Sequence, residues 1–188
     1  MATVKAVLCS GNAHKLVELQ AALPGWELGL LDAADYPAEL GSNYYENALG
    51  KARYGREVGP PDAWMLGEDS GIEATALDGR PGIASARWAE DGVARLLEEL
   101  DGTSERRARY VCELVALGLE GGELRGTGVL EGTIADERRG NEGFGYDPIF
   151  IPIGESRTVA ELGDEWKRSS SHRARAARAL AEAAAAEA

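Results

Sequence analysis

The chain is poor in the residues that build disulfide frameworks and histidine-rich metal sites. Its 188 residues include only 2 cysteines, 2 histidines and 2 phenylalanines, and aromatic residues make up 6%. Cys9 and Cys112 both lie in apolar runs, so they are predicted to be buried thiols in a reducing compartment. With His14 and His172 as the only imidazoles, a zinc site rich in histidine is not expected.

Positive charge and long apolar runs are also scarce. The formal net charge of -12 argues against a surface that binds nucleic acid, since such surfaces carry basic stripes. No apolar stretch reaches membrane-spanning length, and the N-terminal run is too short for a signal peptide. We therefore expect a cytoplasmic protein without a nucleic-acid or membrane partner. The negative net charge does not exclude a small anionic ligand, because such a ligand needs only a local cluster of Lys and Arg.

Hydrophobic periodicity predicts one α/β domain, residues 1–188, with a mixed sheet and no linker. Strands are predicted at 4–9, 26–31 and 63–71, and in two long runs within 108–134 joined by a two-residue Gly-Gly link at 121–122. A loop from 143 enters a further short strand. Helices are predicted at 13–23, from a cap at Asn43 to about 58, behind the cap Asp91 to about 100, and from about 171 onward.

The segment SGNAHK, residues 10–15, joins the first predicted strand to the first predicted helix. It places Lys15 in the first helical turn, where the macrodipole is already positive. One explanation is an anion bound at this helix N-terminus. The alternative is an ordinary turn with a solvated lysine.

Two further segments supply carboxylates. GEDSG, residues 67–71, is read as a strand that breaks into a turn, and Asp69 with Ser70 is an oxygen set that suits Mg²⁺. An Asp-Ser-Gly turn without chemistry is the alternative. Glu39 lies in a predicted loop, and Asn47 and Lys51 share a helix face four residues apart, where they could bind phosphate or form a solvated face.

Two segments near the C-terminus suit a flat, polar ligand. GFGYDPIF, residues 143–150, is an aromatic loop between glycines that could stack on a base or fill the core. Lys167, His172 and Arg173 surround a predicted helix start, where they could bind an anion or a carbonyl oxygen, or simply be solvated. Basic groups, separated carboxylates and a stacking loop together indicate a nucleoside triphosphate with Mg²⁺.

The motifs SGNAHK, ENALGKAR, EDSGIEATALDGRPGIASAR, GFGYDPIF and TVAEL, followed by a Lys ahead of His-Arg, run in one order over most of the chain. In this the chain resembles the inosine triphosphate pyrophosphatases of the Ham1/RdgB type, the XTP/dITP diphosphatases. The resemblance implies an elongated α/β fold with a long curved mixed sheet and two lobes around a cleft, in a homodimer. It also implies hydrolysis of ITP, dITP and XTP to the monophosphate and pyrophosphate with Mg²⁺.

The resemblance also implies roles for individual residues. Glu39 and Asp69 would bind the metal, and Asp69 would also be the general base in the attack of water on the α-phosphorus. The remaining residues would bind substrate: Ser10, Gly11, Asn12, Ala13, His14, Lys15 and Lys51 at the phosphates, Ser70, and Phe144, Gly145, Tyr146, Asp147, Lys167, His172 and Arg173 at the ribose and base. The chain departs from the family pattern at Glu68 and at Arg168-Ser169-Ser170.

Two other functions stay open. A Maf-like pyrophosphatase would act on other modified nucleotides with a different base pocket. A nucleotide-binding regulator without turnover would keep the basic groups but would not need Glu39 and Asp69 together.

Overall fold

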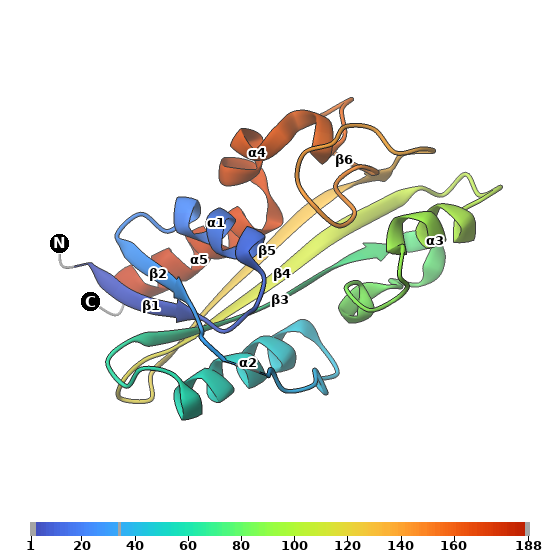
Figure 1. The fold of residues 1–188 in the computed structure, drawn as a ribbon. Helices are drawn as coiled ribbons and strands as arrows, with labels where there is room; N and C mark the ends of the chain where they lie inside the picture. Colours follow the sequence, from blue (N-terminus) through green and yellow to red (C-terminus); the bar gives the residue numbers. More distant parts are fainter. Residues whose placement is uncertain (1–2, 34, 187–188) are drawn as a thin grey trace. The chain divides into compact units, whose positions relative to one another are not determined.

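The computed structural model describes residues 3–33 and 35–186. Over these residues, six strands form a sheet in the order β2-β1-β3-β4-β5-β6 (Figure 1). β1 runs parallel to β2 and β3, whereas β6 runs antiparallel to β5, so the sheet is mixed. The strands are β1 Val4–Leu8, β2 Trp26–Leu30, β3 Trp64–Ala74, β4 Arg107–Leu117, β5 Glu123–Ile134 and β6 Phe150–Pro152.

The helices alternate with strands in the first part of the chain and follow the sheet at its end. They are α1 Ala13–Ala22, α2 Tyr44–Val58, α3 Gly92–Glu99, α4 Val159–Ser170 and α5 His172–Ala186, with 3₁₀ turns at Thr75–Leu77 and Gly82–Ala84. This arrangement confirms the predicted α/β class with a mixed sheet and flanking helices. Within the described ranges, none of the helices is long and apolar enough to cross a membrane.

The chain divides into two compact units. The first contains residues 1–69, 112–128 and 173–188, and the second contains residues 70–111 and 129–172. β3, β4 and β5 each contribute residues to both units.

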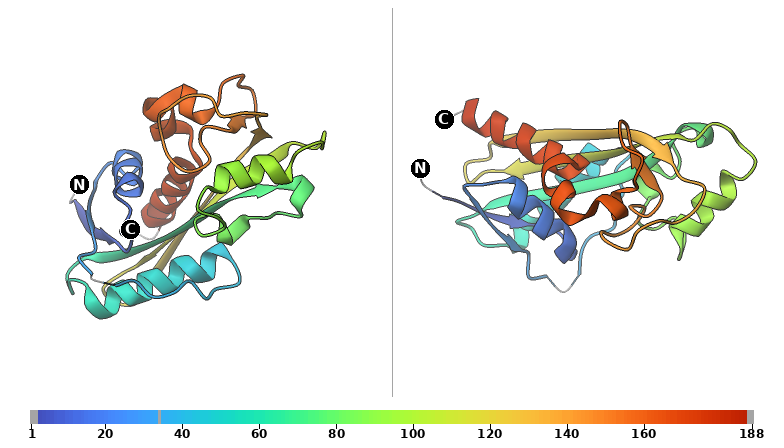
Figure 2. Two further views of the ribbon diagram at one scale, coloured as in Figure 1. Left: turned by 45° about the vertical axis from the view of Figure 1, so that its right-hand side comes forward. Right: turned by 90° about the horizontal axis from the view of Figure 1, so that it is seen from above.

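In the first unit, helices cover both faces of the sheet. α1 and α5 lie on one face and α2 on the other (Figure 2). Neighbouring residues of β4 follow this division, because Leu114 belongs to the cluster with Leu19 and Ala177, whereas Val115 packs with Ala48. Alternate side chains of a strand point to opposite faces, so one apolar strand supplies two separate cores.

The backbone of α2 lies directly against β3 at Gly67. A Cβ at this buried position would stand 1.8 Å from the carbonyl oxygen of Ala48, far inside van der Waals contact. Glycine is therefore required for this close approach of helix and strand. The contact fixes the distance between α2 and the sheet immediately before the Glu68-Asp69 pair.

The second unit has its own apolar core. Ile72 of β3, Leu96 of α3, Tyr110 of β4, Phe150 of β6 and Val159 of α4 belong to this cluster, and all are buried. Side-chain caps fix the starts of both helices. Asp91 accepts a hydrogen bond from the backbone N–H of Ala94, as predicted, and Thr158 forms a capping box with Glu161.

Two local predictions were wrong, and one helix was not predicted. β3 does not turn at residues 67–71 but continues to Ala74, because pairing in the sheet overrides the turn preference of Asp-Ser-Gly. The β4–β5 connection is the longer loop 118–122, closed by a hydrogen bond from Gly118 N–H to the Gly122 carbonyl. Finally, α4 was not predicted, since Gly163, with a φ of 85°, interrupts its helical pattern.

Candidate functional site

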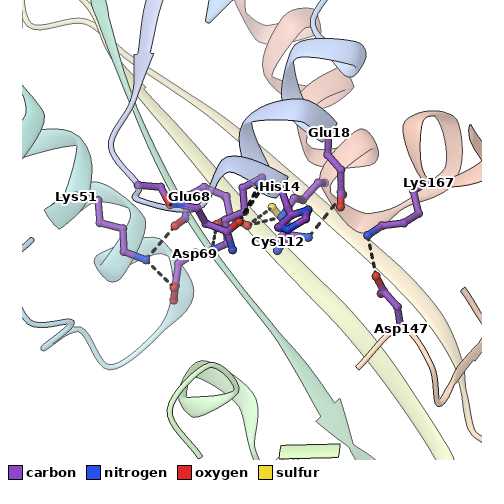
Figure 3. Close-up of polar contacts among 12 residues, drawn as sticks. His14, Glu18, Lys51, Glu68, Asp69, Cys112, Asp147 and Lys167 are labelled. Carbon is purple, nitrogen blue, oxygen red and sulfur yellow. Dashed lines mark hydrogen bonds and ion pairs between the residues drawn. The ribbon is translucent and has the colours of Figure 1, made fainter. Parts of the chain in front are cut away.

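The two neighbouring carboxylates of β3 project from opposite faces of the sheet. Glu68 makes side-chain contacts with Lys15 on α1 and Arg173 on α5, whereas Asp69 contacts Asn47 and Lys51 on α2. Figure 3 shows the contact between Asp69 and Lys51. The opposite directions follow from the alternation of side chains along a strand. Two adjacent carboxylates therefore have separate surroundings and separate chemistry.

Glu68 is the centre of a buried ion-pair network in the first unit. Its side chain is fully buried, with Oε2 2.5 Å from Lys15 Nζ and Oε1 3.0 Å from Arg173 Nε. Burial opposes ionisation, but Lys15, Arg173 and Lys51 outweigh it and hold the pKa of Glu68 well below its ordinary value. The Cys112 thiol also donates to Oε1 at 3.5 Å, and burial raises the pKa of this thiol far above its usual range.

Arg173 is held from two sides within the same unit. Besides the contact of its Nε with Glu68, its Nη1 lies 3.6 Å from Oε2 of Glu18, which is buried on α1. The sequence grouped Arg173 with His172 as a base contact. The structure places its guanidinium in the network that also holds Lys15, where it contacts Glu18 on α1 and Glu68 on β3.

Asp69 is held by two donors of α2. Asn47 Nδ2 and Lys51 Nζ each donate to its carboxylate at 3.0 Å. The two residues are four positions apart and share one face of α2, as predicted. Burial raises the pKa of Asp69 above its ordinary value, although Lys51 and Asn47 act in the opposite direction. A carboxylate with a raised pKa is a better proton acceptor than an ordinary aspartate.

Lys51 brings the two predicted metal ligands together. Its Nζ lies 2.5 Å from Glu39 Oε1 and 3.0 Å from Asp69 Oδ1, and it donates to the Glu68 carbonyl at 3.0 Å. Burial lowers the pKa of Lys51, but the neighbouring carboxylates outweigh this and raise it. Because one ammonium contacts both carboxylates, Glu39 and Asp69 are close enough to share a cation.

The donor set fits a hard cation with few protein ligands. Both candidate ligands are carboxylates, and Mg²⁺ is commonly bound through one or two carboxylates plus water and substrate oxygens. Among the residues that the structure describes, no group of three or more His, Cys, Asp or Glu side chains is placed to hold a metal. A metal at Glu39 and Asp69 would therefore need its other ligands from solvent or substrate.

The segment 10–15 is ordered by its own side chains. Asn12 caps α1 by accepting hydrogen bonds from the backbone N–H groups of His14 at 2.9 Å and Lys15 at 3.4 Å, and its own N–H donates to Ser10 Oγ. Gly11, Ala13 and His14 are exposed. The charge that neutralises Lys15 in this structure is the carboxylate of Glu68, which explains a lysine in the first turn without a ligand.

In the second unit, Asp147 fixes the loop of residues 143–147. Its Oδ2 accepts from Lys167 Nζ at 2.7 Å and from the Phe144 backbone N–H at 2.9 Å, and its Oδ1 accepts from the Tyr110 hydroxyl at 3.2 Å. Asp147 and Lys167 are both buried. Figure 3 shows the contact between them. Lys167 also stands 4.3 Å from the centre of the Phe144 ring.

The two aromatic residues of this loop differ in role. Tyr146 is buried in the apolar core, donates its hydroxyl to the Ser85 carbonyl at 3.0 Å, and burial raises its pKa to about 12. Phe144 is half-buried, so it is the ring of this loop that a flat ligand could reach, whereas Gly145 is exposed. Ser70 on β3 is half-buried, and His172 is buried.

The sequence did not predict four contacts that hold the candidate residues in place. Asn47 shares a helix face with Lys51, but the sequence did not pair it with Asp69. Glu18 and Glu68 form ion pairs with Arg173, which is 105 positions beyond Glu68, and Tyr110 donates to Asp147 across 37 positions. No spacing rule links residues so far apart in the chain, although Glu68 stood inside a motif already singled out.

The chain belongs to the Ham1 family, whose family model matches residues 6–183. This confirms the resemblance inferred from the ordered motifs.

Relatives and solved structures agree with this membership. A protein of Deinococcus deserti named dITP/XTP pyrophosphatase is 43% identical over 183 residues, covering 93% of this chain and 86% of the relative. A Thermus thermophilus protein of the same name is 41% identical, with 96% of this chain and 91% of the relative covered. The structure of the Staphylococcus aureus Ham1 protein matches with a TM-score of 0.85 and 32% identity, covering 98% of this chain and 100% of that one.

Proposed function

We propose that the chain hydrolyses noncanonical purine nucleoside triphosphates, namely ITP, dITP and XTP, to the monophosphate and pyrophosphate. The observation that carries the proposal is the convergence of Glu39 and Asp69 on Lys51, since it joins two carboxylates and a cation within a chain of the Ham1 family. The names of the relatives from Deinococcus deserti and Thermus thermophilus support this substrate class.

The basic side chains of the first unit are assigned to the triphosphate. Lys15, at the start of α1, and Lys51, on α2, are each held by carboxylates of the chain. A bound phosphate would replace part of the contact between these lysines and the carboxylates. Charge-assisted hydrogen bonds to phosphate are among the stronger polar contacts. The remaining residues of segment 10–15 position the phosphates through backbone N–H groups and short side chains.

Asp69 is assigned the proton of the attacking water. Its fixed position between Asn47 and Lys51 suits a side chain that orients water and accepts its proton. Glu39 and Asp69 would hold Mg²⁺, which when bound supplies electrostatic stabilisation of the charge on the phosphate oxygens. Attack at the α-phosphorus then releases pyrophosphate.

The polar groups of the second unit are assigned to the base and ribose. Lys167 and His172 can donate hydrogen bonds to the 6-oxo group of hypoxanthine or xanthine, and Phe144 offers a ring face for stacking. Ser70, Gly145, Tyr146 and Asp147 of the same unit shape this group. Arg173 is assigned separately to recognition of the base. A cytoplasmic homodimer is part of the same proposal.

The test is pyrophosphate release from a panel of ITP, dITP, XTP, GTP and ATP, with and without Mg²⁺. We expect release from the first three, dependent on the metal. Release only from other modified nucleotides would favour a Maf-like enzyme. Binding of ITP without any release would favour a regulator.

A further inference from the structure

We propose that Tyr110 is a positioning residue that determines base specificity, because it joins the two polar groups assigned to the purine base. The inference rests on the proposed function and goes beyond it in naming a residue that need not touch the substrate. Tyr110 lies on β4 within the second unit, and its side chain is buried.

The hydroxyl of Tyr110 fixes one of these groups. It donates to Oδ1 of Asp147 at 3.2 Å, while Oδ2 of the same carboxylate accepts from Lys167 and from the Phe144 N–H. The orientation of the carboxylate therefore sets both the Lys167 ammonium and the loop that carries the Phe144 ring. Residue 143 is a glycine with a φ of 75°, and a Cβ there would meet Asp147 Oδ2 at 2.3 Å.

The ring of Tyr110 fixes the other group. It stacks on the imidazole of His172 with a centroid distance of 4.4 Å and an interplanar angle of 5°. It also contacts Phe150 of the core at 4.6 Å, which anchors the ring. Parallel stacking restricts rotation of the imidazole about its side-chain bonds and so fixes where its N–H groups point.

The chemistry explains why this residue would influence selectivity. A 6-oxo group accepts hydrogen bonds, whereas the 6-amino group of adenine donates them. Lys167 and His172 therefore favour the 6-oxo group only when both donors point toward it. If Lys167 or His172 could turn away, it would no longer be left unpaired against the 6-amino group of adenine. The penalty for binding ATP would then disappear, and with it the discrimination between ITP and ATP. Tyr110 therefore orients both Lys167 and His172 through one buried side chain.

Two substitutions separate its two contacts. Tyr110→Phe keeps the stacked ring and removes the hydroxyl, whereas Tyr110→Leu removes both. Tyr45 is a matched control, because it is a tyrosine whose hydroxyl also donates to a carboxylate, that of Glu123, at 2.8 Å in the first unit. Tyr45→Phe and Tyr45→Leu are therefore compared under the same conditions.

The first measurement tests the geometry and needs no substrate. The chain has 2 histidines, so its imidazole C–H resonances form a two-residue NMR spectrum, recorded well above the ordinary imidazole pKa of about 6.5 and assigned with His14→Gln. The face of the Tyr110 ring should shift the His172 signals upfield. Tyr110→Leu should remove that shift, Tyr110→Phe should retain it, and His14 should not change. Identical His172 signals in wild type and Tyr110→Leu would overturn the proposed stacking.

The second measurement tests specificity, as kcat and KM for ITP and for ATP. Tyr110→Phe should lower kcat/KM for ITP by about 2- to 10-fold, the value of one net hydrogen bond, mainly through KM. ATP turnover should change little, so the ITP/ATP ratio falls, and it should fall further in Tyr110→Leu. An unchanged ratio in folded Tyr110→Phe and Tyr110→Leu would show a merely structural role. Wild-type protein that releases no pyrophosphate from ITP would instead refute the proposed function.

Discussion

Lys15 and Glu68 form an ion pair, with Nζ 2.5 Å from Oε2, in which the carboxylate is fully buried. Asp69, the next residue along β3, pairs with Lys51 but has a pKa shift of the opposite sign. The difference arises because Glu68 is surrounded by three cations, whereas burial dominates at Asp69. The environment therefore favours charge on Glu68 and opposes it on Asp69, which suits a structural role for the first and a reactive role for the second.

Glu68→Gln should be strongly destabilising. The change removes the carboxylate that pairs with both Lys15 and Arg173, and breaking a buried ion pair costs about 3–5 kcal/mol. Chemical denaturation measures the loss, with Glu57→Gln on the exposed face of α2 as the control. An unfolding midpoint equal to that of wild type would show that the network contributes nothing to stability.

The same carboxylate should make wild-type stability sensitive to acid. Because the folded pKa of Glu68 is lowered, its contribution is complete above the ordinary value of 4.5 and is lost as the pH falls from there toward the folded pKa. Thermal unfolding in a series of acidic buffers should therefore show a steeper loss for wild type than for Glu68→Gln. Parallel curves for the two proteins would contradict the assignment.

Asp69→Asn should abolish most turnover without lowering stability. Its folded pKa is raised, so the ionised side chain costs stability at neutral pH, and this cost disappears in the amide. Loss of transition-state stabilisation lowers kcat and kcat/KM together, while nucleotide binding stays measurable. Pyrophosphate release, ITP binding and denaturation are measured on one preparation. Hydrolysis of ITP near the wild-type rate would remove Asp69 from the reaction.

Lys15→Ala should weaken triphosphate binding more than monophosphate binding. Its proposed partner is a phosphate beyond the α position, and such a charged contact is worth about 1.5–3 kcal/mol. The variant should also lose stability, because Glu68 then keeps Arg173 as its main partner. Calorimetric affinities for ITP and IMP decide the matter, and equal weakening of the two would exclude Lys15 from the phosphate site.

Wild-type protein should strongly prefer ITP over ATP, and Arg173→Ala should lose most of this preference by losing ITP activity. Polar mismatches at a base can give discrimination of up to about 10⁴. Arg173→Ala should also unfold more easily, because Glu18 and Glu68 lose their shared partner. Arg178→Ala, on the exposed side of α5, is the control for kcat/KM with both nucleotides. Comparable wild-type values for ITP and ATP would refute the base pocket.

Local patterns predicted much of the fold because its elements carry clear local signals. Asn43 and Asp91 cap their helices as expected, and Asn47 and Lys51 share one face of α2 as their i, i+4 spacing predicts. The turn predicted at residues 67–71 failed because the preference of a short polar segment is weaker than pairing within a sheet.

The partners of the candidate residues were harder to predict, since they depend on packing. In sequence Glu68 is a carboxylate next to Asp69 with no assigned role, and only its burial against Lys15 and Arg173 shows what it does. The contact of Tyr110 with His172 depends on how β4 passes the start of α5, which no local pattern encodes.

The missing side chain at residue 67 has a consequence for protein engineering. Replacing a glycine inside a strand by alanine is a standard route to a more thermostable enzyme, because it reduces the entropy of the unfolded chain. At Gly67 the added methyl group would press on Ala48, the neighbour of Asn47, and so push away the helix that carries both partners of Asp69. A stabilisation campaign should leave this position unchanged and seek its gains at glycines with open surroundings, such as Gly50 on the exposed side of α2.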